Sequence, residues 1–566
     1  MTKGFFSPSR RAWLALVALS VPVLVAVWAL RWFVTQDGPA HTHNAEIMFE
    51  LLRDNAQLAK FYAIRWQPVP NLSGHLLLMG LVAVFPPRVA DQLLMTLTAF
   101  GFAAAVVWLR RQVRGDQNLW VAAPLGVALG LNWLWLMGFY NFMLGSTLFC
   151  LTLGAWWKRR ERFGAAQAAW LSVLLVACYM SHPVPLGMTA AGLGVLVLLT
   201  PGANFLRRLL WTAAAFLPLV PLAVFYRAKM STHGGVELHF EGLTNALSPL
   251  SWLDYFRGPN LLNLTDDGSR AFPFVESYSS WFLPLSTPLL AAVAVVLLLC
   301  ALWLYRDGSQ TDALARARRA WPVLTLLLAA VCLFGPSHFG VQHGNYIRER
   351  VLLMTLAASV TVWNFDASRR LVRLAAVALV LAVAVQSAFV WEYALDSHAR
   401  VGEYMQAQPH VGTNRRFLTL IPPVRRFRAY SLEHAPELLA TGTGNLLWNN
   451  YEPYTYYFPV QFHYQPSQCD DFSLGPYLGP DVRFPGSEYN AYKRAWWDCW
   501  LSQAHDHIDT IVVWGRDPLV ERISEQWYSS QPAFEHGRVR VFHRREEAHG
   551  TDDKGKIASA LPPKKR

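Results

Sequence analysis

The sequence predicts an α-helical polytopic membrane protein with a C-terminal extracytoplasmic α/β domain. First, 53% of the 566 residues are hydrophobic and only 16% are charged, a composition too apolar for an ordinary water-soluble protein. Second, apolar runs long enough to cross a bilayer recur throughout residues 1–391. Third, short β-rich runs alternate with a helical stretch between residues 392 and 548.

The membrane module is predicted to occupy residues 1–391 and to contain about eleven spans, because about 20 apolar residues cross the ~30 Å hydrocarbon core. We expect these spans at residues 12–34, 88–109, 118–138, 140–157, 165–181, 184–200, 206–226, 281–305, 320–336, 350–365 and 371–391. The first span is too long for a cleavable signal core, which favours an uncleaved anchor. The apolar segment 71–87 would invert the later charge pattern if it crossed, so we expect a re-entrant or interfacial arm there.

The net charge of +12 reflects the predicted topology, and we expect no nucleic-acid partner. Every second connection between spans is basic, whereas the short alternate ones, "MGFYN" and "SHPVP", carry no Lys or Arg. The positive-inside rule then places the N-terminus in the cytoplasm, and the loops 35–70 and 227–280 and the C-terminal domain outside. We therefore expect a multi-pass protein of the bacterial inner (plasma) membrane, with a periplasmic or extracellular C-terminal domain.

The outer domain, residues 392–548, is predicted to be a small α/β unit. Its β-rich runs are "RFLTLI" at 416–421, "TIVVWG" at 510–515 and "RVRVFH" at 538–543, with a helix at 489–505. Residues 549–566 lack apolar periodicity and are predicted to be a disordered tail. Cys469 and Cys499 are the only cysteines in this region, so an oxidising compartment would favour a disulfide between them.

The stretch "TQDGPAHTHNAEI" places Asp37, His41 and His43 directly after the first span. Gly38 and Pro39 are typical of a helix start, with Asp37 beside its positive end. An apolar stripe of Ala45, Met48, Phe49 and Leu52 predicts that this helix lies along the membrane interface. Two interpretations stay open: Asp37 caps the helix and the histidines are solvated, or Asp37 acts as a general base at the membrane surface.

This layout resembles the GT-C superfamily of polyprenyl-phosphate-sugar-dependent glycosyltransferases, such as the protein O-mannosyltransferases and the lipid A aminoarabinose transferases. The resemblance covers an Asp after the first span, an amphipathic first external loop, about a dozen spans and a C-terminal external α/β domain. In those families the acid belongs to an Asp-Glu or Asp-Asp pair, whereas Asp37 is followed by Gly38. The resemblance implies inverting transfer of a sugar from a polyprenyl-phosphate donor to an extracytoplasmic glycan, lipid or protein acceptor, with Asp37 as the base.

Such a transfer needs cations at the outer surface for the departing phosphate. Arg348 and Arg350, in "HGNYIRERVLL", are the candidates; the alternative is interfacial anchoring beside Glu349. Asn141 and His182 at outer helix ends are expected either to line the substrate cavity together with His41 and His43 or to serve as satisfied helix-end groups.

Two further features leave alternatives open. His338 and His343 could join Asp37 or His41 around a divalent metal ion, although no His-x-x-x-His spacing supports this. The aromatic run 445–466 suits stacking on sugar rings as well as packing within the outer domain.

The sequence contains no P-loop, dinucleotide fingerprint or nucleophile elbow. The rival class is a non-enzymatic carrier, flippase or assembly factor for lipid-linked saccharides. The predicted span interiors are nearly free of ionisable groups, which favours a site at the external interface over a transmembrane route.

Overall fold

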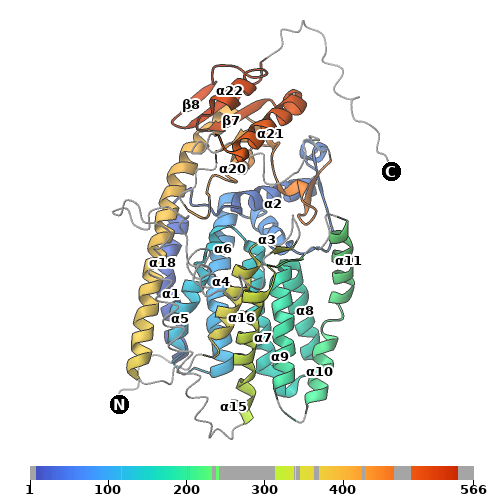
Figure 1. Cartoon of the computed structure of the whole chain (residues 1–566), viewed down its shortest axis with the longest axis vertical. Coiled ribbons are helices and arrows are strands. Elements are labelled where there is room, and N and C mark those ends of the chain that lie inside the picture. Colours follow the sequence, from blue (N-terminus) through green and yellow to red (C-terminus); the bar gives the residue numbers. More distant parts are fainter. Residues whose placement is uncertain are drawn as a thin grey trace.

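The computed structural model shows a mostly helical chain in which long apolar helices stand side by side and a smaller region of helices and strands covers one end (Figure 1). It describes residues 8–116, 118–200, 202, 204–232, 238–240, 313–336, 338–339, 345–362, 369–422, 427–463 and 486–545. The predicted span 281–305, most of the loop 227–280 and the predicted tail 549–566 lie outside these residues.

Among the described residues, three helical stretches are long and apolar enough to cross a membrane: Ser9–Ala29 in α1 (Pro8–Ala29), α4 (Pro87–Arg114), and Val372–Val411, which includes most of α18 (Arg369–Tyr404). A fourth results if α10 (Phe205–Ala214) and α11 (Leu219–Ser231), bent by 47°, form one span. Large apolar side chains on α1 and α18 face outward, as contact with lipid requires; they include Leu14, Val17, Leu374 and Val377. Membrane association is therefore supported, whereas the count of eleven spans stays a prediction.

Several other predicted spans correspond to apolar helices of at most 17 residues, which fall short of the ~20 residues of a full span. They include α8 (Ala165–Ser181), α9 (Pro183–Leu199), α16 (Ala320–Phe334) and α17 (Ile347–Ser359), and the predicted span 118–138 is broken into η2 (Leu119–Val121), α5 (Ala122–Gly130) and α6 (Trp133–Leu136). The arm 71–87 contains α3 (Ser73–Val82), whose ten residues extend about 15 Å at 1.5 Å per residue, half the hydrocarbon thickness. This length fits the predicted re-entrant arm.

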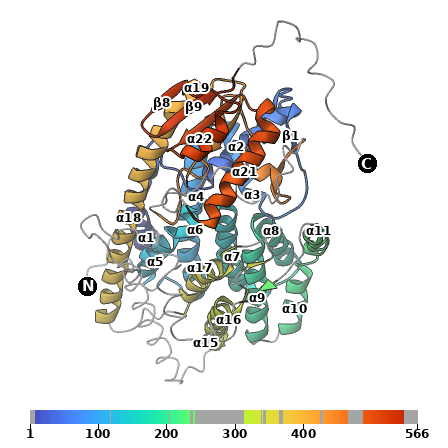
Figure 2. The same ribbon diagram turned by 45° about the horizontal axis from the view of Figure 1, so that its top comes forward.

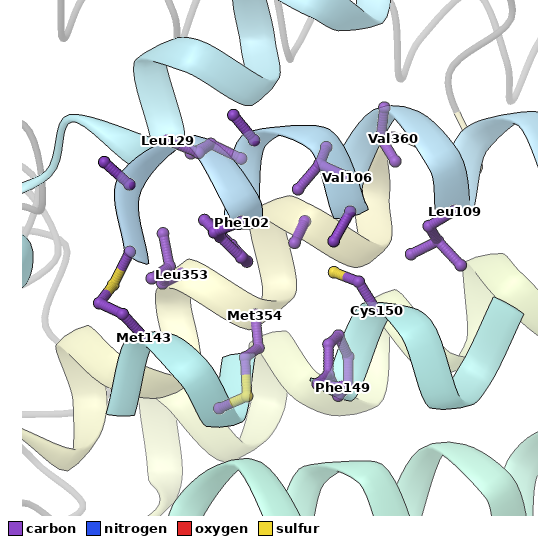
Figure 3. Packing of buried hydrophobic residues seen from close by; sticks show 14 of the residues in the cluster. Phe102, Val106, Leu109, Leu129, Met143, Phe149, Cys150, Leu353, Met354 and Val360 are labelled. Atoms are coloured by element: carbon purple, nitrogen blue, oxygen red, sulfur yellow. The ribbon is translucent and has the colours of Figure 1, made fainter. Parts of the chain in front are cut away.

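The helical core forms where α4 packs against α5 and α7 (Tyr140–Arg159), and where α17 packs against the same two helices. Phe102 and Val106 of α4 meet Phe149 of α7 and Met354 of α17 in a continuous apolar layer (Figure 3). A Cβ at Gly130 of α5 would come within 2.5 Å of the carbonyl oxygen of Ala99, so small residues let α4 and α5 approach closely.

The C-terminal region contains a five-stranded sheet in the order β5-β4-β7-β9-β8. Strands β5, β4 and β7 are parallel, and β9 and β8 are antiparallel to their neighbours. The predicted runs become β4 (Arg416–Leu420), β7 (Thr510–Trp514) and β9 (Val539–His543), and the predicted helix becomes α21 (Glu488–Ala504). The sequence did not indicate β5 (Leu446–Leu447), β8 (Phe534–His536), α19 (Gln408–Val411), α20 (Pro436–Ala440) or α22 (Pro518–Ser524).

The first predicted loop joins the helices to the C-terminal region. Helix α2 (Gly38–Leu52) lies at the boundary between them (Figures 1 and 2). Beyond it, β1 (Tyr62–Ile64) pairs antiparallel with β6 (Val460–Phe462). Of the remaining short elements, α15 (Ala313–Arg318) precedes α16, and β2 (Leu238–His239) pairs with β3 (His338–Phe339).

The interpretation in which the histidines of α2 are solvated is wrong. Every residue from Gly38 to Ala45 is buried, because α3, α4 and α20 pack against the helix. Ala45 and Met48 of the predicted stripe are buried, but Leu52 is 53% exposed. His41 and His43 are therefore interior groups and not solvated ones.

Candidate functional site

A cavity of about 1030 Å³ lies where the helices meet the C-terminal region. Five residues that the sequence singled out line it: Asp37, His41, Asn141, His182 and Arg350. The rest of its wall combines aromatic rings with three acidic or basic groups from the C-terminal region and one arginine of α11; among them are Trp133, Phe139, Tyr140, Phe142, Tyr226, Arg227, Tyr346, Arg428, Glu433, His434, Tyr451, Tyr457 and Phe458.

The backbone around Asp37 is fixed by the turn after α6. The amide of Gln36 donates to the Leu136 carbonyl (2.9 Å) and that of Asp37 to the Met137 carbonyl (3.1 Å). Gly138 has φ +81°, and a Cβ there would come within 2.9 Å of the Asp37 nitrogen. The predicted helix cap is wrong in detail, because Asp37 occupies the N-cap position without making a side-chain capping bond.

Gly38 explains why no second acid follows Asp37. A Cβ at this position would lie 2.4 Å from Thr35 Oγ1, 2.7 Å from the Tyr140 hydroxyl and 3.0 Å from Asp91 Oδ1. Those groups are themselves hydrogen-bonded, since Tyr140 donates to Asp91 (2.7 Å) and its hydroxyl lies 2.9 Å from that of Thr35. The space beside Asp37 is thus filled by a polar network that includes the carboxylate of Asp91.

The carboxyl group of Asp37, whose side chain is 14% exposed, lies next to a histidine of the C-terminal region. Nε2 of His434 lies 3.6 Å from Asp37 Oδ1, and Nδ1 of the same ring lies 3.3 Å from Glu437 Oε1. Burial raises the pKa of Asp37 to about 7, although the positive charge of His434 acts to lower it. Burial also opposes the charged form of His434, but Glu437 and Asp37 outweigh that effect and raise the pKa of His434 to about 9.

These pKa directions give Asp37 the properties of a general base near neutral pH. A carboxyl group with a pKa near 7 is partly ionised there and is a stronger proton acceptor than an ordinary aspartate. His434 is then an imidazolium that stabilises the ionised form of Asp37. No local sequence pattern indicated this pairing, because His434 and Glu437 follow Asp37 by about 400 residues.

Arginines from three different elements line the same cavity. Arg350 of α17 lies over Phe139 (4.7 Å) and Phe142 (5.4 Å), and its Nη1 contacts Nε2 of His182. Arg428 of the C-terminal region lies over the ring of Trp133 at 3.5 Å, and Arg227 belongs to α11. Sequence reasoning missed Arg227 and Arg428. A wall with several guanidinium groups suits an anionic oxygen-rich group such as a phosphate.

Arg348, the other predicted phosphate ligand, does not line the cavity. Its carbonyl accepts a hydrogen bond from Cys332 Sγ (3.6 Å). The structure therefore separates two arginines that the sequence grouped together.

The predicted cavity residues Asn141 and His182 also make helix-end bonds. Asn141 Oδ1 accepts from the Gly74 amide (2.6 Å) and its Nδ2 donates to the Asn71 carbonyl (2.9 Å), which fixes the start of α3. His182 Nδ1 accepts from the Val184 amide (3.1 Å) and caps α9. The two interpretations of these residues are thus compatible, because a side chain that ends a helix also faces the cavity.

Of the remaining predicted histidines, His43 is buried, lies 3.8 Å from Glu46 and is not part of the cavity wall. His338 begins β3, and His343 lies outside the described residues. A metal site formed by His338 and His343 with Asp37 or His41 therefore stays a prediction.

A different histidine cluster borders the cavity. Nδ1 of His41 lies 2.5 Å from Glu452 Oε1, and Nε2 of His75 lies 2.8 Å from Glu452 Oε2. Burial acts to raise the pKa of Glu452, but the two histidines outweigh it and lower that pKa to about 2. Sequence reasoning missed His75 and Glu452; a histidine within the apolar segment 71–87 was the available signal.

The described part of the aromatic run 445–466 contributes both to the cavity wall and to packing, whereas stacking on sugar rings stays a prediction. Tyr451, Tyr457 and Phe458 line the cavity, whereas Trp448 and Tyr456 are buried within the protein. Cys499 lies on α21 and is disulfide-bonded, and Cys469, its predicted partner, lies outside the described residues.

In comparisons with known proteins, no family model matches the chain and no curated protein matches it. The function is therefore argued from the chemistry of the cavity.

Proposed function

We propose that this protein is a GT-C-like membrane glycosyltransferase that moves a sugar from a polyprenyl-phosphate donor to an extracytoplasmic acceptor. One observation carries the proposal: the carboxyl group of Asp37 and the guanidinium group of Arg350 line one cavity at the end of a set of apolar helices. A base and a phosphate ligand are the two groups that the transfer requires.

The cavity wall contains groups that suit the phosphate and the sugar or isoprene parts of such a donor. The guanidinium groups of Arg227, Arg350 and Arg428 suit the phosphate. The ring of Tyr457 in the cavity wall offers a surface for a sugar or for the first isoprene units. The size of about 1030 Å³ is at the upper end of ligand pockets, as two substrates together require.

In the proposed reaction Asp37 removes the proton from an acceptor hydroxyl as its oxygen attacks the anomeric carbon. The new glycosidic bond forms on the face opposite the phosphate, and the carbon–oxygen bond to the phosphate breaks. The electron pair leaves with the polyprenyl phosphate, whose charge Arg350 and its neighbouring arginines stabilise. The configuration at the anomeric carbon is inverted. His434 keeps Asp37 in its ionised form before the attack.

We also propose the predicted topology for this reaction, with the cavity and the C-terminal region outside a bacterial inner membrane. The buried contacts between α2 and the C-terminal region support a common side for both. The amides of Asn44 and Asn450 form a reciprocal pair (3.0 and 2.9 Å), and the Tyr430 amide donates to Gln36 Oε1 (2.9 Å).

The test is a transfer assay with the purified full-length protein in lipid nanodiscs. A panel of radiolabelled polyprenyl-phosphate sugars is supplied with a crude membrane extract as acceptor, beside the Asp37→Asn variant. We expect label in product with the wild-type protein alone. Donor binding without transfer by either protein would refute the transferase and support the carrier or flippase class.

A further inference from the structure

The cluster of His41, His75 and Glu452 has a donor set that metal ions use. Two imidazole nitrogens and one carboxylate oxygen form a ligand set typical of Zn²⁺ and related divalent ions. The ligand atoms of the three side chains all lie within 4.8 Å of one another. Two atoms bound to Zn²⁺ at about 2.1 Å lie at most ~4.2 Å apart, so small side-chain movements complete the geometry.

Burial strengthens the case for a cation. The side chains of His75 and Glu452 are 0% exposed and that of His41 is 7% exposed. A carboxylate removed from water needs a compensating positive charge, and the ion-pair partners His41 and His75 of Glu452 are charged only when protonated. A divalent ion would neutralise Glu452 without requiring either ring to be protonated.

We propose that His41, His75 and Glu452 bind a divalent transition-metal ion, for which Zn²⁺ is the best-fitting probe. The ligands come from three elements that are distant in sequence: α2, α3 and η5 (Glu452–Tyr454). The ion links the C-terminal region, through Glu452, to α2 and α3. Three protein ligands leave one position of a tetrahedral ion open, and His41 lines the cavity, so an anionic substrate oxygen can complete the coordination.

The site is independent of the proposed sugar transfer, because metal content is measured without any substrate. The full-length protein is purified with an affinity tag that contains no histidine and is dialysed against metal-free buffer. Its zinc, manganese, iron, cobalt and nickel contents are then determined by plasma mass spectrometry. We expect about one equivalent of one metal per chain.

Two ligand variants and one matched control locate the ion. His75→Ala and Glu452→Gln are expected to lose at least about tenfold in metal occupancy, since each removes one of three ligands. His43→Ala is the control, because His43 is a buried histidine on α2, the helix that also contains His41, and is not a member of the cluster. Metal retained by both ligand variants would show that it binds elsewhere and would overturn the assignment.

A second measurement covers the case in which the ligand variants fail to fold. Wild-type protein is stripped with a chelator and titrated with Co²⁺, whose visible d–d absorption reports coordination. We expect a saturable spectrum that Zn²⁺ abolishes, and an unfolding temperature that falls on chelation and recovers with Zn²⁺. A wild-type protein that is purified without metal and gives no Co²⁺ spectrum contains only a hydrogen-bonded His–Glu–His network, and the proposal is then rejected.

Discussion

The carboxyl group of Asp37 and the imidazole ring of His434 lie 3.6 Å apart in a buried contact between α2 and the C-terminal region. The other ring nitrogen, Nδ1, lies 3.3 Å from Oε1 of Glu437. The ionised form of Asp37, the candidate base, is thus stabilised by His434, which follows it by about 400 residues. Neither the helices nor the C-terminal region alone contains the complete site.

Replacing Asp37 by Asn is expected to lower sugar transfer by about 10²- to 10⁴-fold, because the amide cannot accept the acceptor proton. The variant should fold, since Asp37 makes no side-chain capping bond that the change would break. Asp54→Asn is the control: Asp54 follows the same helix with φ 58°, a conformation that Asn tolerates. Radiolabel transfer at saturating donor measures both. Equal rates for wild type and Asp37→Asn would exclude Asp37 as the base.

The transfer rate is expected to rise with pH through about 7, because Asp37 has to be ionised to accept a proton. Loss of the cation in His434→Gln should move the midpoint of this rise to higher pH, since His434 lowers the pKa of Asp37 against the effect of burial. A pH profile of kcat/KM measures the shift, with His43→Gln as the control. A midpoint unchanged in His434→Gln contradicts the electrostatic role given to His434.

The same pKa shift predicts a pH-dependent difference in stability. Asp37 titrates at about 7 in the folded protein and near 3.8 when unfolded, so folding favours its protonated form. This contribution is fully present below about 3.8 and is lost as the pH rises through about 7. Asp37→Asn should therefore become more stable relative to the wild type as the pH increases over this interval. Unfolding temperatures of both proteins at several pH values test this, and parallel curves would contradict it.

Arg350→Gln is expected to weaken binding of a polyprenyl-phosphate donor by about 10- to 100-fold, the range for loss of a charge-assisted hydrogen bond. Arg348→Gln removes the same charge two residues earlier but outside the cavity wall, so its effect should be much smaller. Equilibrium binding of labelled donor to both variants provides the comparison. Similar losses in the two would indicate a general effect of charge and not a phosphate contact.

Gly38→Ala is expected to destabilise the fold by about 1–3 kcal/mol, because the added methyl group overlaps Thr35, Tyr140 and Asp91. Gly80→Ala is the matched control: it lies in α3 with no atom within 4 Å of its would-be Cβ, and Ala is the better helix former. Thermal unfolding separates the two substitutions. A Gly38→Ala protein as stable as Gly80→Ala would mean that the crowded network can rearrange freely.

The elements predicted correctly are those with a strong local signal. Alternating or continuous β-branched runs indicated β4, β7 and β9, and the aromatic periodicity of 489–505 indicated α21. The short strand β5 lacks such a signal, because its two residues form a strand only beside β4. The break within 118–138 was missed for a similar reason: hydropathy does not detect that Asn132 caps a new helix through its bond to the Trp135 amide.

Site residues were predicted where their position in the sequence was informative. They were missed where their role depends on contacts with residues distant in the sequence. The place of Asp37 after an apolar helix indicated a surface carboxyl group, and the structure puts it in the cavity wall. The burial of α2 was not predicted, because the helices that bury it, α3, α4 and α20, lie outside its own sequence. His75, Arg428, His434 and Glu452 each acquire their role only through partners from another part of the chain.

The pairing of β1 with β6 has a consequence for biosynthesis. Residues Tyr62–Ile64 leave the ribosome about 400 residues before their partners Val460–Phe462. At about 5–20 residues per second, the N-terminal strand waits roughly 20–80 s with an unpaired edge. A chain truncated before residue 460 would keep that edge exposed. The exposed edge of β1 is therefore expected to need protection from pairing with other chains during this interval. Pairing of β1 with β6 then distinguishes a finished chain from an unfinished one.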